Sequence, residues 1–191
     1  MYRTARGWLV CTLAAGLLIC IPAHAQETDT NVAIAAVSAG GIFGLGAHGS
    51  IGGSIAYPSS KHLMPFFDLS YSPLTSYGFT YGADNTGKGL YRSSVLDVNG
   101  GIRIRFPGKG DWVPYVGLGA GALRFSSSTY MSGFGTTDTS YRNHTDLAGN
   151  ASVGGLYYIT QHLGLSLELK GYAAQHNRFF RATAGVFCQF P

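Results

Sequence analysis

Seven charged residues carry the chemistry that this sequence offers. Acids and bases that share one face of a sheet can pair with each other, or they can line a narrow path for water. Unpaired charges in a dry interior are costly, so opposite signs are expected to meet. We therefore predict a structural charge network, with a pore lined by the same side chains as the alternative. All seven fall on the polar face of alternating stretches: Asp68, Asp97, Arg103, Arg105, Glu168, Lys170 and Arg181.

Catalytic patterns are weak by comparison. His144 with Asp146 and the serines at 126–128 suggest a hydrolase site, but their spacing does not require one. No glycine-rich run joins a strand to a helix, as a phosphate-binding loop must. We expect no enzymatic activity, no metal and no cofactor, and a lipid-modifying enzyme is the catalytic alternative. The other histidines of the mature chain are scattered, without the spacing of metal ligands: His48, His62, His162 and His176.

The stretch from Val95 to Phe125 indicates which elements position the charges. Its first arm alternates apolar with polar residues for about ten positions, which is the period of a strand. A turn rich in proline and glycine follows at 107–111, and a second arm alternates apolar residues with glycines. A strand of about ten residues with one apolar face, ended by an aromatic residue, is typical of a membrane-spanning β-barrel.

The rest of the mature chain repeats this pattern. Six further stretches are predicted to be strands: 32–43, 49–57, 63–71, 147–158, 163–170 and 179–190. Short turns at 58–62 and 160–162 alternate with polar stretches at 73–91 and 126–143, which we expect to be exposed loops that could contact a surface ligand. Short turns on the periplasmic side and long loops outside suit an outer-membrane barrel. The predicted fold is all-β, a single antiparallel up-and-down barrel of about eight strands.

Aromatic residues recur where the predicted strands meet the short turns. Amphipathic rings at one level form a girdle at a membrane interface. The alternative is that they are core residues of a soluble sandwich or of a lipocalin-like, ligand-binding barrel in the periplasm or outside the cell. Because aromatic residue and turn recur together, the girdle is the favoured interpretation. Its members are Tyr57, Phe106, Trp112, Tyr157, Tyr158 and Phe190.

The composition agrees with a surface that faces lipid. Of the 191 residues, 12% are charged and 13% are aromatic, whereas ordinary soluble domains have roughly 25% charged residues. Residues 1–25 have a basic start, a short apolar run and small residues before Gln26, so they are predicted to be a signal peptide, with the barrel domain at 26–191. Lipidation at Cys20 is disfavoured by the bulky Ile19 before it.

Removal of the signal peptide changes the charge balance. Loss of Arg3 and Arg6 leaves eleven bases against nine acids, a net charge of +2. The sequence contains no basic patch of the kind that nucleic-acid binding requires, so no nucleic-acid partner is expected. Only Cys188 remains of the three cysteines, which excludes a disulfide within the mature chain.

With these motifs in order, the chain resembles the small bacterial outer-membrane β-barrels. These include the transmembrane domain of outer-membrane protein A and the opacity-type porin family. The resemblance spans essentially the whole mature chain, and the segments that carry it are HGSIGGSIAYPSSKHLMPFFDLSYSPL, DVNGGIRIRFPGKGDWVPYVGLGAGALRF and RATAGVFCQF. It implies a barrel in the outer membrane of a diderm bacterium, in contact with outer-membrane lipid, with a structural or surface-exposed role. Such barrels usually end on a phenylalanine that the barrel-assembly machinery reads, and here Phe190 is followed by Pro191.

Overall fold

The computed structural model describes residues 32–81, 87–107, 110–133 and 136–190. The predicted signal peptide lies outside these ranges. Within them every regular element is a strand, and no helix is long and apolar enough to cross a membrane.

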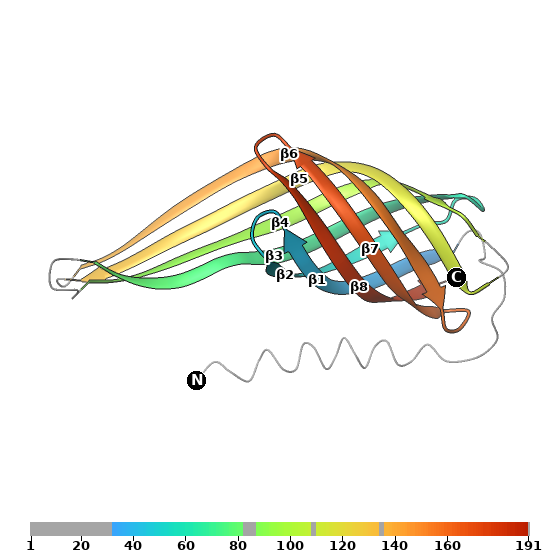
Figure 1. The fold of residues 1–191 in the computed structure, drawn as a ribbon, viewed down its shortest axis with the longest axis horizontal. Coiled ribbons are helices and arrows are strands. Elements are labelled where there is room, and N and C mark those ends of the chain that lie inside the picture. Colours follow the sequence, from blue (N-terminus) through green and yellow to red (C-terminus); the bar gives the residue numbers. More distant parts are fainter. Residues whose placement is uncertain (1–31, 82–86, 108–109, 134–135, 191) are drawn as a thin grey trace.

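Eight strands close into one barrel (Figure 1). Each strand pairs antiparallel with the next one along the chain, and β1 pairs antiparallel with β8 to complete the circle. The predicted all-β, up-and-down barrel of about eight strands is therefore confirmed. The strands are β1 (Ala33–Phe43), β2 (His48–Ala56), β3 (Leu63–Tyr81), β4 (Gly87–Arg105), β5 (Trp112–Gly133), β6 (Thr136–Tyr158), β7 (Leu163–Ala174) and β8 (Arg178–Phe190).

The period-two pattern assigns each side chain to the outside of the barrel or to the enclosed space, which we call the lumen. In β7, Leu165, Leu167 and Leu169 are 45%, 54% and 47% exposed, while Lys170 is 0% exposed. An apolar surface this extensive is unusual on a soluble monomer and marks a surface that meets lipid or a partner. Other exposed apolar side chains of the barrel wall are Ile51, Ile55, Phe67, Leu69, Ile102, Ile104, Val116, Leu118 and Val153.

Four neighbouring strands are much longer than the rest. β3 to β6 have 19, 19, 22 and 23 residues, against 9 to 13 in the others. Figure 1 shows them running past the short strands as one extended sheet. We call this part, residues 72–81, 87–95, 125–133 and 136–147, the projecting sheet. At about 3.3 Å per residue, nine residues extend it roughly 30 Å from the barrel.

The predicted loops at 73–91 and 126–143 are therefore wrong. Strand pairing continues along the described residues of both ranges, with Tyr77 opposite Tyr91 and Ser128 opposite Tyr141. The sequence reads as a loop there because polar residues occupy both faces of the sheet and remove the apolar alternation. Threonine and tyrosine nevertheless favour strands, and each chain segment has a neighbour with which to pair its backbone.

The lumen is filled in three layers. An apolar cluster near the short turns comprises Ile34, Ala56, Met64, Phe66, Val113, Tyr115, Leu156 and Phe187. A second cluster at the base of the projecting sheet comprises Ile42, Val95, Leu123, Ala148, Tyr172 and Phe179. Buried polar and charged side chains occupy the space between the two clusters.

Candidate functional site

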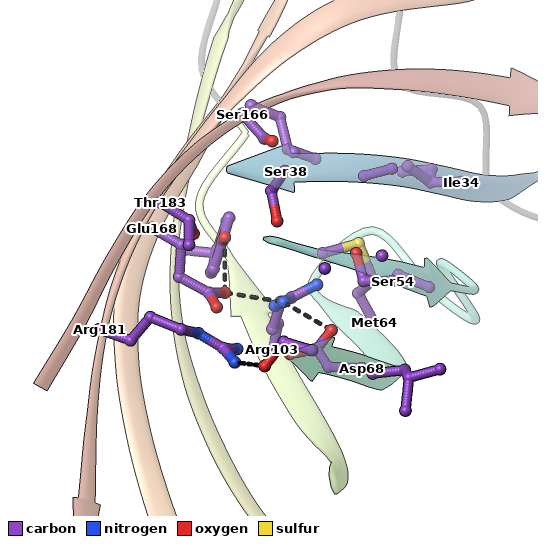
Figure 2. Close-up of a pocket in the computed structure, with 18 residues that line it drawn as sticks. Ile34, Ser38, Ser54, Met64, Asp68, Arg103, Ser166, Glu168, Arg181 and Thr183 are labelled. Carbon is purple, nitrogen blue, oxygen red and sulfur yellow. Dashed lines mark hydrogen bonds and ion pairs between the residues drawn. The ribbon is translucent and has the colours of Figure 1, made fainter. Parts of the chain in front are cut away.

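Four charged side chains from three strands meet in the middle layer of the lumen. Figure 2 shows three of them, with Arg103 bonded to both Glu168 and Asp68. Arg103 Nη2 lies 2.7 Å from Glu168 Oε2 and 3.4 Å from Asp68 Oδ1. Lys170 Nζ lies 3.1 Å from Glu168 Oε1 and also bonds Asp68 Oδ2. Each base contacts both acids, so the four side chains form a closed ring of alternating charge, and we call it the lumen ring.

Aromatic side chains support the lumen ring from the first apolar cluster. The hydroxyl of Tyr115 donates a hydrogen bond to Glu168 Oε2 at 2.8 Å. The guanidinium of Arg103 lies 4.2 Å from the ring centre of Phe66 and 5.0 Å from that of Tyr115. A cation over an aromatic face is attracted by the ring quadrupole, and more strongly away from water. Tyr115 therefore links the charged layer to the apolar one.

A second ion pair lies beside the ring. Arg181 Nη1 is 2.8 Å from Asp97 Oδ2 and also bonds the hydroxyl of Ser70. The carboxylate of Asp97 accepts further hydrogen bonds from Tyr172 at 2.6 Å and from the Asn99 amide at 3.0 Å. Asp97 is thus a buried charge whose oxygens are well satisfied, as burial requires.

The sequence analysis did not identify two tyrosines that donate hydrogen bonds to the buried acids. Tyr115 and Tyr172 are 2% and 4% exposed, and each donates its hydroxyl to a buried carboxylate. The signal was available from the alternation, because Tyr172 is two residues from Lys170 and must share its face. The alternation does not show which carboxylate each tyrosine hydroxyl meets across the lumen.

Arg105 does not join the predicted network. Its side chain is 1% exposed, but its guanidinium Nη2 donates to the backbone carbonyl of Ser60 at 2.7 Å, and no described acid pairs with it. The reason is its position at the end of β4, level with the turn between β2 and β3 and beyond the first apolar cluster. Arg105 therefore holds a turn, and the charge network contains the six other predicted residues.

A small cavity of about 40 Å³ adjoins the two ion-pair groups. Its wall carries the hydroxyls of Ser38, Ser54 and Ser166 together with Arg103 and Arg181 (Figure 2). The Nε groups of both arginines are buried without a hydrogen-bond partner among the described protein atoms. A polar cavity of this size holds one or a few water molecules, which would satisfy such donors.

Five of the six predicted girdle residues point outward beside the short turns. Their exposed fractions are 46% for Tyr57, 51% for Phe106, 43% for Trp112, 44% for Tyr157 and 46% for Phe190.

The placement of Tyr158 in the girdle is wrong. Its ring packs on the first apolar cluster and meets Phe187 edge to face, with ring centres 4.9 Å apart. Neighbouring residues of a strand point to opposite faces, so Tyr157 and Tyr158 cannot both face outward.

The suggested hydrolase constellation is not assembled. His144 stacks on Phe125 with ring centres 4.8 Å apart, and Asp146 instead bonds His176 Nδ1 at 3.2 Å. Among the described residues no group of three or more histidines, cysteines, aspartates or glutamates is placed to hold a metal ion.

The two faces of the projecting sheet differ. The face continuous with the lumen carries an aromatic cluster, in which the ring of Tyr77 lies 5.3 Å from that of Tyr91 and 6.2 Å from that of Phe79. The face continuous with the outer wall of the barrel carries mainly hydroxyls, together with the exposed bases Lys88 and Arg92. Neither face has the dense apolar cover of the barrel wall, so the projecting sheet suits an aqueous environment.

Comparisons with known proteins identify the fold. No protein-family model and no curated protein matches the chain. Among solved structures, the chain is similar to the N-terminal β-barrel domain of Pseudomonas aeruginosa OprF, with a TM-score of 0.52, 17% identity and coverage of 85% of this chain and 100% of that one. Neisserial surface protein A has a TM-score of 0.54 and 16% identity. The match covers 86% of this chain and 100% of that protein. Ail, the attachment invasion locus protein of Yersinia pestis, has a TM-score of 0.53 and 15% identity. The match covers 85% of this chain and 100% of Ail.

All three similar structures are small outer-membrane barrels, and each is covered over its full length. With its own closed, antiparallel arrangement of eight strands, this chain has the fold of the eight-stranded outer-membrane β-barrels.

Proposed function

We propose that this protein is a non-enzymatic outer-membrane barrel that anchors the projecting sheet and displays it outside the cell as a contact surface. The observation that carries the proposal is the pairing of β3 to β6 far beyond the short strands, from Ser72 to Tyr81 in β3 with one register shift after Pro73. A barrel wall built only to span a membrane needs strands of about 9–11 residues, so the added length serves another purpose.

The orientation follows from the two ends of the barrel. The turns that join β2 to β3, β4 to β5 and β6 to β7 share one end with the start of β1 at Ala33 and the end of β8 at Phe190. The projecting sheet leaves from the other end, together with the β1–β2 and β7–β8 turns (Figure 1). Outer-membrane barrels keep short turns in the periplasm and longer extensions outside. The five outward aromatic residues beside the short turns would then form the periplasmic girdle, and the apolar wall would contact lipid.

The lumen has a structural role in this proposal. Three acids face three bases in the middle layer, and apolar clusters lie on both sides of it. An eight-stranded barrel has an interior just wide enough to be filled by side chains. The charges therefore pair within a closed core, and a passive pore is the less favoured function.

A contact role also agrees with what the similar proteins are called. One is described as a surface protein and another as an attachment invasion locus protein, of which one structure contains a heparin analogue. Those names apply to those proteins. For this chain, attachment is supported by the aromatic cluster, in which Tyr77 is exposed, and by the hydroxyl-rich outer face of the projecting sheet.

Site-directed labelling of intact cells tests the proposal. Arg92→Cys lies on an exposed position of the projecting sheet, and Lys61→Cys lies on the exposed turn between β2 and β3. A thiol reagent that does not cross membranes should label Arg92→Cys in intact cells and Lys61→Cys only after lysis. Cys188 is buried and provides the unlabelled background in the parent protein. Equal labelling of both variants, or recovery of the protein in the soluble fraction, would refute the proposed display.

A further inference from the structure

One edge of the projecting sheet lacks a neighbouring strand. β6 pairs with β5 along its whole length, from Thr136 opposite Gly133 onward, but its pairing with β7 begins only at Ala148. Residues 136–147 therefore have a strand on one side only among the described pairings. The backbone N–H and C=O groups of such an edge are a template for another strand.

The edge segment of β6 has neither a proline nor a bulge to oppose strand addition, and its protection is limited to its charges. Proteins protect their edges with proline, bulges or short strands. The opposite side of the projecting sheet has such features, because Pro73 lies in β3 where the register shifts. By contrast, residues 136–145, TTDTSYRNHT, contain no proline and no glycine, and half of them are threonine or tyrosine. These residue types favour strands.

The same segment is complementary to itself. If two copies of β6 pair antiparallel about Ser140, Asp138 of each copy lies opposite Arg142 of the other, and Thr139 lies opposite Tyr141. Asp138, Ser140 and Arg142 share one face of the strand, so both charge pairs form on the same side. Opposite charges and pairs of an aromatic with a β-branched residue stabilise cross-strand contacts when they lie directly opposite.

The two charges are available for this contact. Asp138 and Arg142 are exposed, and neither side chain takes part in an ion pair within the described part of the chain. Charges on an edge strand deter strands that do not match them. A strand whose acid and base lie opposite Arg142 and Asp138 can pair with this edge, and β6 of a second copy is such a strand.

We propose that residues 136–144 of β6 pair antiparallel with the same residues of a second copy of this protein, and this rests on the proposed display of the projecting sheet. Strands of such barrels tilt by about 35–45° from the membrane normal. Two copies in one membrane therefore run β6 in directions that differ by at most about 90°, which does not permit antiparallel pairing. The pairing joins barrels in facing membranes, so the partner is a copy on a neighbouring cell.

Charge reversal gives a specific test in mixed cells. Cells that display the parent protein should clump, and cells that display Asp138→Arg or Arg142→Asp alone should lose at least tenfold in clumping, because both cross-strand pairs become repulsive. When the two variant strains are mixed, every pair again joins an acid to a base, and mixed clumps should return. Arg92→Asp, a charge reversal at an exposed position of β4 away from the edge, is the matched control and should clump like the parent.

Crosslinking identifies the register and the membrane of the partner. Ser140→Cys lies on the proposed two-fold axis and should form disulfide-linked dimers between differently tagged copies from two strains. Thr129→Cys, its neighbour on β5 and not on the edge, should not. Heat-modifiable mobility on gels verifies that each variant is folded.

The outcomes separate the two proposals. If Arg92→Cys is labelled on intact cells but the parent does not clump, or mixing the reversed strains does not restore clumping, the self-pairing is refuted and the display stands. Dimers that form only within one strain refute the pairing across cells. Failure of the surface labelling refutes the display itself.

Discussion

Neutralising Glu168 is the most direct perturbation of the lumen ring. Glu168 accepts from Arg103 at 2.7 Å, Lys170 at 3.1 Å and Tyr115 at 2.8 Å. Glu168→Gln keeps the shape of the side chain and removes its charge. Two buried bases are then left with Asp68 as the only acid of the ring.

The expected cost follows from burial of the ring. The side chains of Glu168 and Lys170 are 10% and 1% exposed, so water cannot replace the lost partner well. Removing one partner of a buried ion pair typically costs about 3–5 kcal/mol of the free energy of unfolding. With a slope of about 2 kcal/mol per molar urea, the unfolding midpoint falls by roughly 2 M.

The assay is urea unfolding of the folded barrel in lipid vesicles, followed by tryptophan fluorescence and by the mobility shift on gels. Asp138→Asn is the matched control, because it neutralises an exposed acid and should change stability by less than about 0.5 kcal/mol. Lys170→Met in the Glu168→Gln background should cost less than the sum of the single changes, because the remaining Arg103 and Asp68 still balance. If the free energy of unfolding of Glu168→Gln lies within about 0.5 kcal/mol of the parent value, the lumen ring is not a stabilising element.

Three further outcomes test the packing and the closed lumen. Gly155→Val should destabilise the barrel by about 1–3 kcal/mol, because a Cβ there would lie 2.1 Å from the Trp112 ring. Gly149→Val should be tolerated, because a Cβ at Gly149 would have no atom within 4 Å. Equal urea midpoints for the two variants would contradict this. Tyr115→Phe should cost about 1.5–3 kcal/mol through its lost bond to a carboxylate, whereas Tyr158→Phe, whose buried hydroxyl has no described partner, should be neutral or stabilising in the same assay. In planar bilayers the folded protein should show no conductance steps, and regular single-channel currents would refute a closed lumen.

The alternation of apolar and polar residues was sufficient to predict which side chains face outward from the barrel wall. Leu165, Leu167 and Leu169 alternate with polar residues ending at Lys170, and the structure exposes the leucines and buries the lysine as that pattern predicts. Parity is a local property of an extended chain, so no tertiary information is needed to assign a face. The same rule places Tyr158 in the lumen, and the prediction that put it in the girdle did not apply it.

The projecting sheet could not be recognised from the sequence. Tyr77 and Tyr91, or Ser128 and Tyr141, lie opposite each other in strands that the composition indicated as loops. Their faces meet water, so burial imposes no apolar alternation on them. The two hairpins also pair with each other, with Arg92 of β4 opposite Ser128 of β5. This pairing supplies backbone partners that the composition of either segment does not show.

The sequence by itself determined the strand class, the strand count, the short turns and the side of the wall on which each barrel charge lies. Only the tertiary structure decided which charges meet. Lys170 bonds Asp68 although 102 positions separate them, while Arg105, on the same face as Arg103, bonds a turn. The physical reason is that closure and stagger of the barrel set the height of each residue along the lumen, and ion pairing depends on that height as well as on parity.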